Sequence, residues 1–113
     1  MRNLRNSVQL IGNVGSAPEV KTFDSGRVKA SCSMATNSSY KNQKGEKIEE
    51  TQWHNLVFWG KLAEVVGEHV KKGNEIAIEG KLMHRAYDNA QGEKRYITEI
   101  TVNDMVMLGS KRK

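Results

Sequence analysis

A single change in hydrophobic period constrains the fold of this chain most strongly. Leu62, Val65, Val66 and Val70 recur at the spacing of one helix face. Elsewhere in the chain, apolar residues recur at every second position, as in β-strands. The segment Lys71-Lys72-Gly73 places cations and a glycine where a helix C-terminus favours them. The chain is therefore predicted to contain one helix in an otherwise β-rich fold.

Alternating segments lie on both sides of this helix. They cover residues 8–14, 28–34, 51–59, 76–82 and 96–102, and residues 20–23 are predicted to resume the first strand. Three strands, one helix and two strands is the element order of the OB-fold. The predicted fold is thus all-β, a five-stranded Greek-key barrel with one helix between strands 3 and 4. A chain of 113 residues suits one domain, here residues 1–109, followed by a short basic end at 110–113.

Two stretches fall outside these strands. Residues 37–50, NSSYKNQKGEKIEE, are almost free of apolar side chains and are predicted to be a long polar loop or an extended hairpin. Loops of this length in compact domains often carry function. Residues 105–108 are predicted to be a short apolar tail segment.

Both tryptophans lie in the third strand, six positions apart and therefore on one face. That face carries Trp53, Asn55, Val57 and Trp59, and the other carries His54, Leu56 and Phe58. Leu56 and Phe58 make an ordinary apolar pair, whereas a buried Asn55 would need hydrogen-bond partners, so we place the tryptophan face outside. The reverse assignment stays open at this point, because tryptophans are mostly buried in proteins. Six residues span roughly 20 Å along a strand, which suits two separate stacking positions on an extended ligand.

The remaining aromatic residues extend this pattern. Tyr40 lies in the polar stretch, and Tyr87 shares the parity of Lys81 and Arg85 rather than that of the apolar positions. Phe23 and Tyr96 have core-like surroundings in the sequence. The predicted exposed set is therefore Tyr40, Trp53, Trp59 and Tyr87.

Basic residues are interleaved with these rings. The formal net charge is +5, but Lys111, Arg112 and Lys113 supply three of those charges, and residues 1–110 carry 15 basic against 13 acidic residues, or +2. The candidates for phosphate contacts are Arg27, Lys29, Lys41, Lys61, Lys72 and Arg85; each is equally well explained as a solvated surface charge. Aromatic platforms along a cationic groove are typical of proteins that bind single-stranded nucleic acid, at roughly 1–3 kcal/mol per stacked base. Phosphate contacts specify no sequence, so little base preference is expected.

From residue 6 to 108 the chain resembles the bacterial single-stranded DNA-binding protein family of replication, recombination and repair. The matching pieces are NSVQLIGNVGSAPEV, the strand ending in MATN, WHNLVFWGKLAEV, KKG after the helix, IAIEGKL and YDNAQGEKRYITEI. The resemblance implies an OB-fold homotetramer around which single-stranded DNA wraps, in the cytoplasm and associated with the nucleoid. The family's stacking positions fall on Tyr40, Trp53, Trp59 and Tyr87. Two positions that are often tryptophan in the family, 40 and 87, are tyrosine here, and position 59, often phenylalanine, is tryptophan.

The resemblance also concerns His54 and the end of the chain. His54 matches a histidine that the family uses at a subunit contact; a merely packed histidine is the alternative. Family members usually continue into a flexible linker and an acidic tip that recruits partner proteins, whereas this sequence ends in Lys111-Arg112-Lys113. We therefore expect DNA binding without recruitment through an acidic tail.

Other function classes find little support in the sequence. The histidines and aspartates are scattered, so no catalytic residues, metal site or cofactor is expected, and no apolar run is long enough for a membrane span. Cys32 is the only cysteine, and its alternation predicts a small buried hydrophobe rather than a reactive thiol. Two alternatives remain open: a protein-interaction adapter like the related primosome proteins and, more remotely, a carbohydrate-binding OB module.

Overall fold

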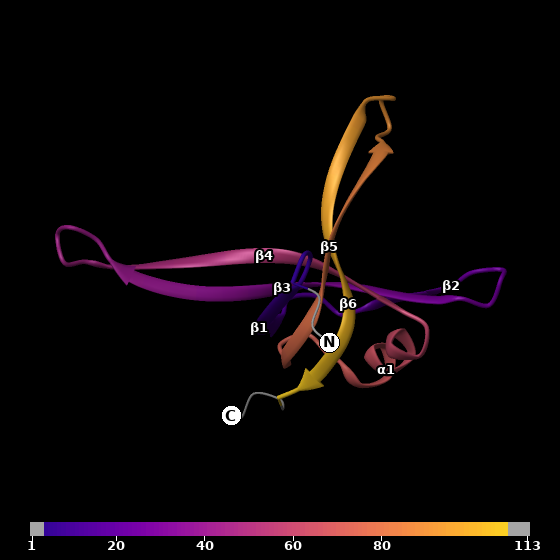
Figure 1. Ribbon diagram of the computed structural model, residues 1–113, viewed down its shortest axis with the longest axis horizontal. Coiled ribbons are helices and arrows are strands. Elements are labelled where there is room, and N and C mark those ends of the chain that lie inside the picture. The colour runs from indigo at the N-terminus through magenta and orange to yellow at the C-terminus, as the bar shows by residue number, and fades with distance from the viewer. Residues whose placement is uncertain (1–3, 109–113) are drawn as a thin grey trace.

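The computed structural model of the protein describes residues 4–108 and contains six strands and one helix. In chain order these are β1 (Val8–Val14), β2 (Glu19–Thr22), β3 (Val28–Lys41), β4 (Lys47–Trp59), α1 (Lys61–His69), β5 (Glu75–Asp88) and β6 (Lys94–Met107) (Figure 1). The basic end at residues 110–113 lies outside the described residues.

Five of the strands close into a barrel. The sheet order is β1-β5-β6-β4-β3-β2, and an additional pairing of β1 with β3 closes the ring. All pairings are antiparallel except that of β4 with β6. With α1 between the third and fourth barrel strands, the OB-fold prediction is confirmed. One detail of the prediction was wrong: residues 19–22 do not resume β1 but form a separate strand, β2, paired with β3.

Two glycines allow the barrel to close. A Cβ on Gly12, in β1, would lie 2.2 Å from the backbone oxygen of Ala35 in β3. A Cβ on Gly80 would lie 2.3 Å from the backbone oxygen of Thr101, next to the irregularity in the β5–β6 register at Glu79/Gly80. Any larger residue would push two strands apart, so both positions require close backbone approach.

The barrel interior takes the even-numbered residues of β3, β4 and β5. Met34, Leu56, Phe58 and Ile76 are fully buried, and α1 contributes Ala63 and Val66 to the same core. The prediction that Leu56 and Phe58 face inward is confirmed. Cys32 belongs to this core too, and burial raises the pKa of its thiol to about 11, which fits the predicted buried hydrophobe.

The β3–β4 and β5–β6 hairpins both extend well beyond the barrel (Figure 1). Their tips share one pattern, Tyr-x-Asn-x-x-Gly-Glu-Lys, at residues 40–47 and 87–94. In each tip the asparagine side-chain oxygen accepts two backbone N–H bonds of 2.9 Å, and the glycine takes a positive φ of 82° or 79°. Of the two predictions for residues 37–50 the extended hairpin is confirmed, and residues 105–107 end strand β6 rather than forming a separate tail.

Candidate nucleic-acid interface

The outer face of β4 carries both tryptophans, but the two are not equally exposed. Trp53 is 63% exposed, Trp59 is half-buried, and Val57 between them is buried. Trp53 lies against Gly15, where a Cβ would come within 2.3 Å of the ring. The prediction that the tryptophan face lies outside is therefore confirmed for Trp53, holds in part for Trp59 and is wrong for Val57.

A hollow of about 390 Å³, lined by polar and apolar side chains, opens on this face between the two tryptophan positions. Hydroxyl groups line one side, where the side chains of Ser16 and Ser33 are hydrogen bonded at 3.2 Å. On the other side the Asn55 amide donates to the Thr98 carbonyl oxygen at 3.3 Å, and Glu99 completes the rim. The hollow thus offers exposed polar groups between two rings, a mixture suited to the edges of an unstacked base.

Trp59 is held by its neighbours at the far end of β4. The Phe23 ring stacks beside it, with centroids 6.0 Å apart and planes at 24°. The Arg27 guanidinium lies 4.1 Å from the Trp59 ring centroid, and the Lys29 ammonium lies at 5.7 Å. Both distances are within the range of cation–π attraction.

Tyr87 lies on the same outer face, on the β5–β6 hairpin. Leu82 pairs with the core residue Ile100 and therefore has the inward parity of β5. Tyr87 has the opposite, outward parity, as predicted. Two residues earlier on that face, Arg85 donates two hydrogen bonds, of 3.1 and 3.0 Å, to the Glu99 carboxylate. These bonds raise the pKa of the guanidinium above its ordinary value. Arg85 is therefore not a free cation, which the sequence prediction did not anticipate.

Tyr40 is exposed but lies on the opposite face of the β3–β4 ladder from Trp53. Trp53 pairs with Ala35 and Tyr40 with Ile48, so Tyr40 shares the parity of the core residue Met34. Of the four predicted rings, Trp53, Trp59 and Tyr87 have the parity that points out of the barrel. The structure places Tyr40 on the continuation of the inner face, beyond the end of the barrel.

The other predicted cations are exposed or half-exposed. Lys41 lies near the tip of the β3–β4 hairpin, Lys61 begins α1, and Lys72 follows that helix. None of these three, nor Arg27 or Lys29, forms an ion pair within 4.0 Å with a residue among 4–108. Arg85, by contrast, forms an ion pair with Glu99.

His54 points away from the tryptophans, as predicted from its parity. It is half-buried, and its Nε2 lies 3.0 Å from the Thr36 hydroxyl oxygen, which pins the ring to the neighbouring strand. This contact accounts for packing within the chain and leaves the predicted subunit contact untested.

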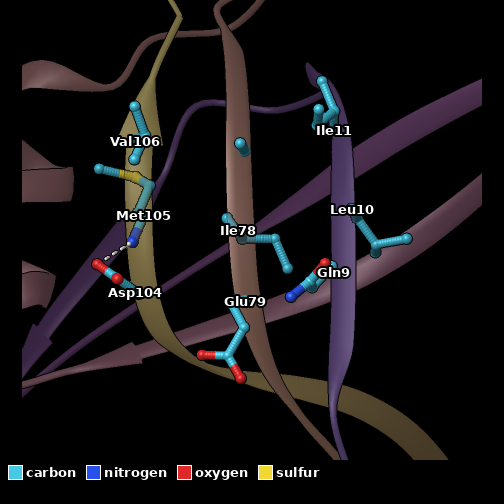
Figure 2. A pocket seen from close by; sticks show the side chains of 9 residues that line it. Gln9, Leu10, Ile11, Ile78, Glu79, Asp104, Met105 and Val106 are labelled. Atoms are coloured by element: carbon cyan, nitrogen blue, oxygen red, sulfur yellow. Dashed lines mark hydrogen bonds between the residues drawn. The ribbon is translucent and has the colours of Figure 1, made fainter. Parts of the chain in front are cut away.

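Another hollow, of about 470 Å³, lies away from the aromatic face, over β1, β5 and β6 (Figure 2). Its sides are Leu10 and Ile11 on β1 and Met105 and Val106 on β6, with Ile78 between them (Figure 2). Ile11 and Val106 are more than half exposed. This surface is mainly apolar, unlike the hollow between the tryptophans.

Residues 4–108 contain no group of three or more histidine, cysteine or acidic residues that could hold a metal ion. In the same part of the chain, no helix has the length and apolar character needed to cross a bilayer.

Comparison with known proteins agrees with this geometry. The sequence profile of the single-strand binding protein family matches residues 5–108. The chain belongs to this family. It is 44% identical to single-stranded DNA-binding protein 1 of Xylella fastidiosa, over 95% of this chain and 79% of that protein. It is 43% identical to the protein of the same name from Chlorobaculum tepidum, over 94% of this chain and 66% of the relative.

Solved structures of the single-strand binding family have the same fold. A Plasmodium falciparum SSB in complex with ssDNA superposes with a TM-score of 0.85 at 28% identity, over 96% of this chain and 98% of that one. A deletion mutant of the Thermus aquaticus single-stranded DNA-binding protein gives a TM-score of 0.81 at 25% identity, over 92% of this chain and 50% of that one. The expected family resemblance is thereby confirmed.

Two residues of this face were missed by the sequence analysis. Phe23 was expected in the core, although its place directly before the Asp24-Ser25-Gly26 turn was a signal for a hairpin end. Glu99 was not considered at all. The register of the β5–β6 hairpin pairs Arg85 with Ile97, which places Glu99 diagonally across from Arg85.

Proposed function

We propose that this protein binds single-stranded DNA without sequence preference and protects it during replication, recombination and repair. Bases stack on Trp53, Trp59 and Tyr87 along the outer face. Tyr40 provides a fourth ring where the strand passes around the β3–β4 hairpin. Phosphates are bound by cations, for which Arg27, Lys29, Lys41, Lys61, Lys72 and Arg85 are the candidates. No chemical reaction and no cofactor are part of this function.

The proposal rests on the side chains that the outer face of β4 presents. A tryptophan that is 63% exposed stands at one end of a hollow lined by polar and apolar side chains, and a second tryptophan with two cations on its ring stands at the other. Base faces are accessible in single strands and hidden in a duplex, so such a surface favours single strands. Rings together with nearby cations match the bases and phosphates of a single strand, which disfavours a protein-interaction adapter.

The test is a competition experiment. A fluorescently labelled oligo-dT is titrated with the protein and its anisotropy recorded, then unlabelled single strand or duplex of equal length is added at several salt concentrations. We expect the single strand to compete and the duplex to compete far less. The logarithm of the affinity should fall by about 0.7 per neutralised phosphate for each unit of log salt. Equal competition by duplex, or an affinity independent of salt, would contradict the proposal.

We also propose that the protein acts in the cytoplasm, at the nucleoid, as a homo-oligomer, most simply a tetramer. One feature supports an assembly: the apolar hollow over β1, β5 and β6 with its exposed Ile11 and Val106. Sedimentation of Ile11→Glu tests whether this surface is a subunit contact. A smaller species with an unchanged circular dichroism spectrum is expected, whereas an unchanged assembly would remove this surface from the account.

A further inference from the structure

A second group of aromatic and cationic side chains lies where the β2–β3 hairpin meets the end of β4. We name it the Phe23 cluster; its members are Lys21, Phe23, Arg27, Lys29 and Trp59. Phe23 stacks beside Trp59, the Lys21 ammonium lies 5.1 Å from the Phe23 centroid, and Arg27 lies 4.1 Å from that of Trp59. Each of the two stacked rings therefore has at least one cation close to it.

The hairpin turn fixes this arrangement. The Phe23 N–H donates to the Arg27 carbonyl oxygen at 2.8 Å, and the Gly26 N–H donates to the Phe23 carbonyl oxygen at 2.8 Å. Gly26 takes a φ of 92°, which a side chain would disfavour. Phe23 and Arg27 are thus held opposite each other, directly beside the turn of the hairpin.

The cations of the cluster have no ion-pair partner within the described part of the chain. Lys21, Arg27 and Lys29 form no ion pair within 4.0 Å with any residue among 4–108. The two rings are partly exposed, so packing of the core does not account for three cations gathered around them. An anion that also presents a flat apolar face would satisfy both features, and a nucleotide unit of a single strand has both.

Resting on the function proposed above, we infer that the Phe23 cluster is a further DNA-binding position. A base stacks against the Phe23–Trp59 pair, and the adjoining phosphates are bound by Lys21 and Arg27. A strand that runs along the outer face of β4 from Trp53 reaches Trp59 after roughly 20 Å and continues directly onto Phe23. The β2–β3 hairpin projects to the end of the molecule opposite the β3–β4 tip, so the bound strand follows the length of this sheet (Figure 1).

The experiment compares two substitutions of Phe23. Phe23→Leu keeps an apolar side chain and removes the ring, whereas Phe23→Tyr keeps the ring. Affinity for labelled oligo-dT is measured by anisotropy at two salt concentrations, with thermal unfolding recorded in parallel. Phe23→Leu should bind roughly 5- to 150-fold more weakly, since a lost base stack has about that effect, and Phe23→Tyr should bind like the unsubstituted chain.

Lys21→Gln gives an independent reading, because this side chain is exposed and its change does not alter the core. The slope of log affinity against log salt should become shallower by about 0.7, with Lys21→Arg restoring it. If Phe23→Leu lowers only the unfolding temperature while it and Lys21→Gln bind DNA as the unsubstituted chain does, the cluster serves packing and the inference is wrong. If the unsubstituted chain itself fails to bind oligo-dT, the proposed function fails first.

Discussion

The two ends of the outer face of β4 carry the same residue type in different surroundings. Trp53 and Trp59 share a strand, a face and a side chain, but Trp53 rests on Gly15 and is largely exposed, whereas Trp59 is enclosed by Phe23 and Arg27. Parity along a strand decides which face a ring takes. How much of the ring a ligand can reach is decided by segments that cross it from elsewhere in the chain. We therefore regard Trp53 as an open platform and Trp59 as a ring that also stabilises the fold.

The largest effect is expected for Trp59→Ala, which removes both roles. Loss of a half-buried aromatic side chain should lower the free energy of unfolding by about 1–2 kcal/mol. Loss of one base stack should weaken binding of oligo-dT by a further 1–3 kcal/mol, roughly 5- to 150-fold. Chemical denaturation and anisotropy measure the two quantities separately, with Trp59→Phe as a control that keeps a ring. An unchanged stability would show that the two ends of β4 do not differ.

Trp53→Ala should weaken binding to a similar extent but leave stability nearly intact. The ring is largely exposed, so the free energy of unfolding should change by no more than about 0.5 kcal/mol, as is usual for surface positions. The same two measurements apply, and Trp53→Phe is the matched control. A loss of stability as large as that of Trp59→Ala would show that the two tryptophans contribute equally to the fold.

Glu99→Gln tests whether the ion pair on this face restrains Arg85. The Glu99 side chain is only 13% exposed, and both of its oxygens accept hydrogen bonds from Arg85. Removing the negative charge frees the guanidinium for phosphate. We expect a severalfold higher affinity for oligo-dT and a salt slope that is steeper by about 0.7. A weaker affinity would mean that Glu99 holds Arg85 in its DNA-binding position, so that Arg85 contacts phosphate only when paired.

The smallest effect concerns Cys32, which lies in the core behind this face. Its thiol pKa is raised from 9.0 to about 11 by burial, so the folded state holds the proton more tightly than the unfolded state. The resulting stabilisation is complete below pH 9 and is lost as the pH rises towards 11. Native protein at pH 8 should react with a thiol reagent far more slowly than urea-unfolded protein, and Cys32→Ala should remove the signal. Equal rates would contradict the burial.

The barrel and the outer face of β4 could be predicted from the sequence because both follow from local periodicity. The single helical stripe at Leu62–Val70 and the alternation of the strands were enough for the fold. Parity divided the residues of β4 between two faces, and the poor fit of Asn55 in a core favoured the correct assignment, with Leu56 and Phe58 inside and Trp53 exposed.

Strand parity no longer predicts burial where a strand extends beyond the barrel. Tyr96 alternates with the buried Ile100 and Val102, so it was expected in the core, but it is 74% exposed. At residue 96, β6 has left the barrel and is paired only with β5, opposite Ala86, so an inward parity no longer means burial. Tyr40, on the β3–β4 hairpin, also has the inward parity but is exposed because it lies beyond the barrel. The contact between Phe23 and Trp59 was also out of reach, since it joins segments 36 positions apart whose proximity depends on the closed sheet.

The most direct test of the central claim uses one tryptophan at a time. Trp59→Phe leaves Trp53 as the only indole and Trp53→Phe leaves Trp59, so each fluorescence signal reports one end of β4. Both variants are titrated with oligo-dT and, separately, with duplex of equal length. We predict that the single strand quenches Trp53 strongly and Trp59 as well, and that duplex quenches neither at the same concentration. Single-strand binding that leaves the Trp53 emission unchanged would contradict the claim that this face is the platform on which bases stack.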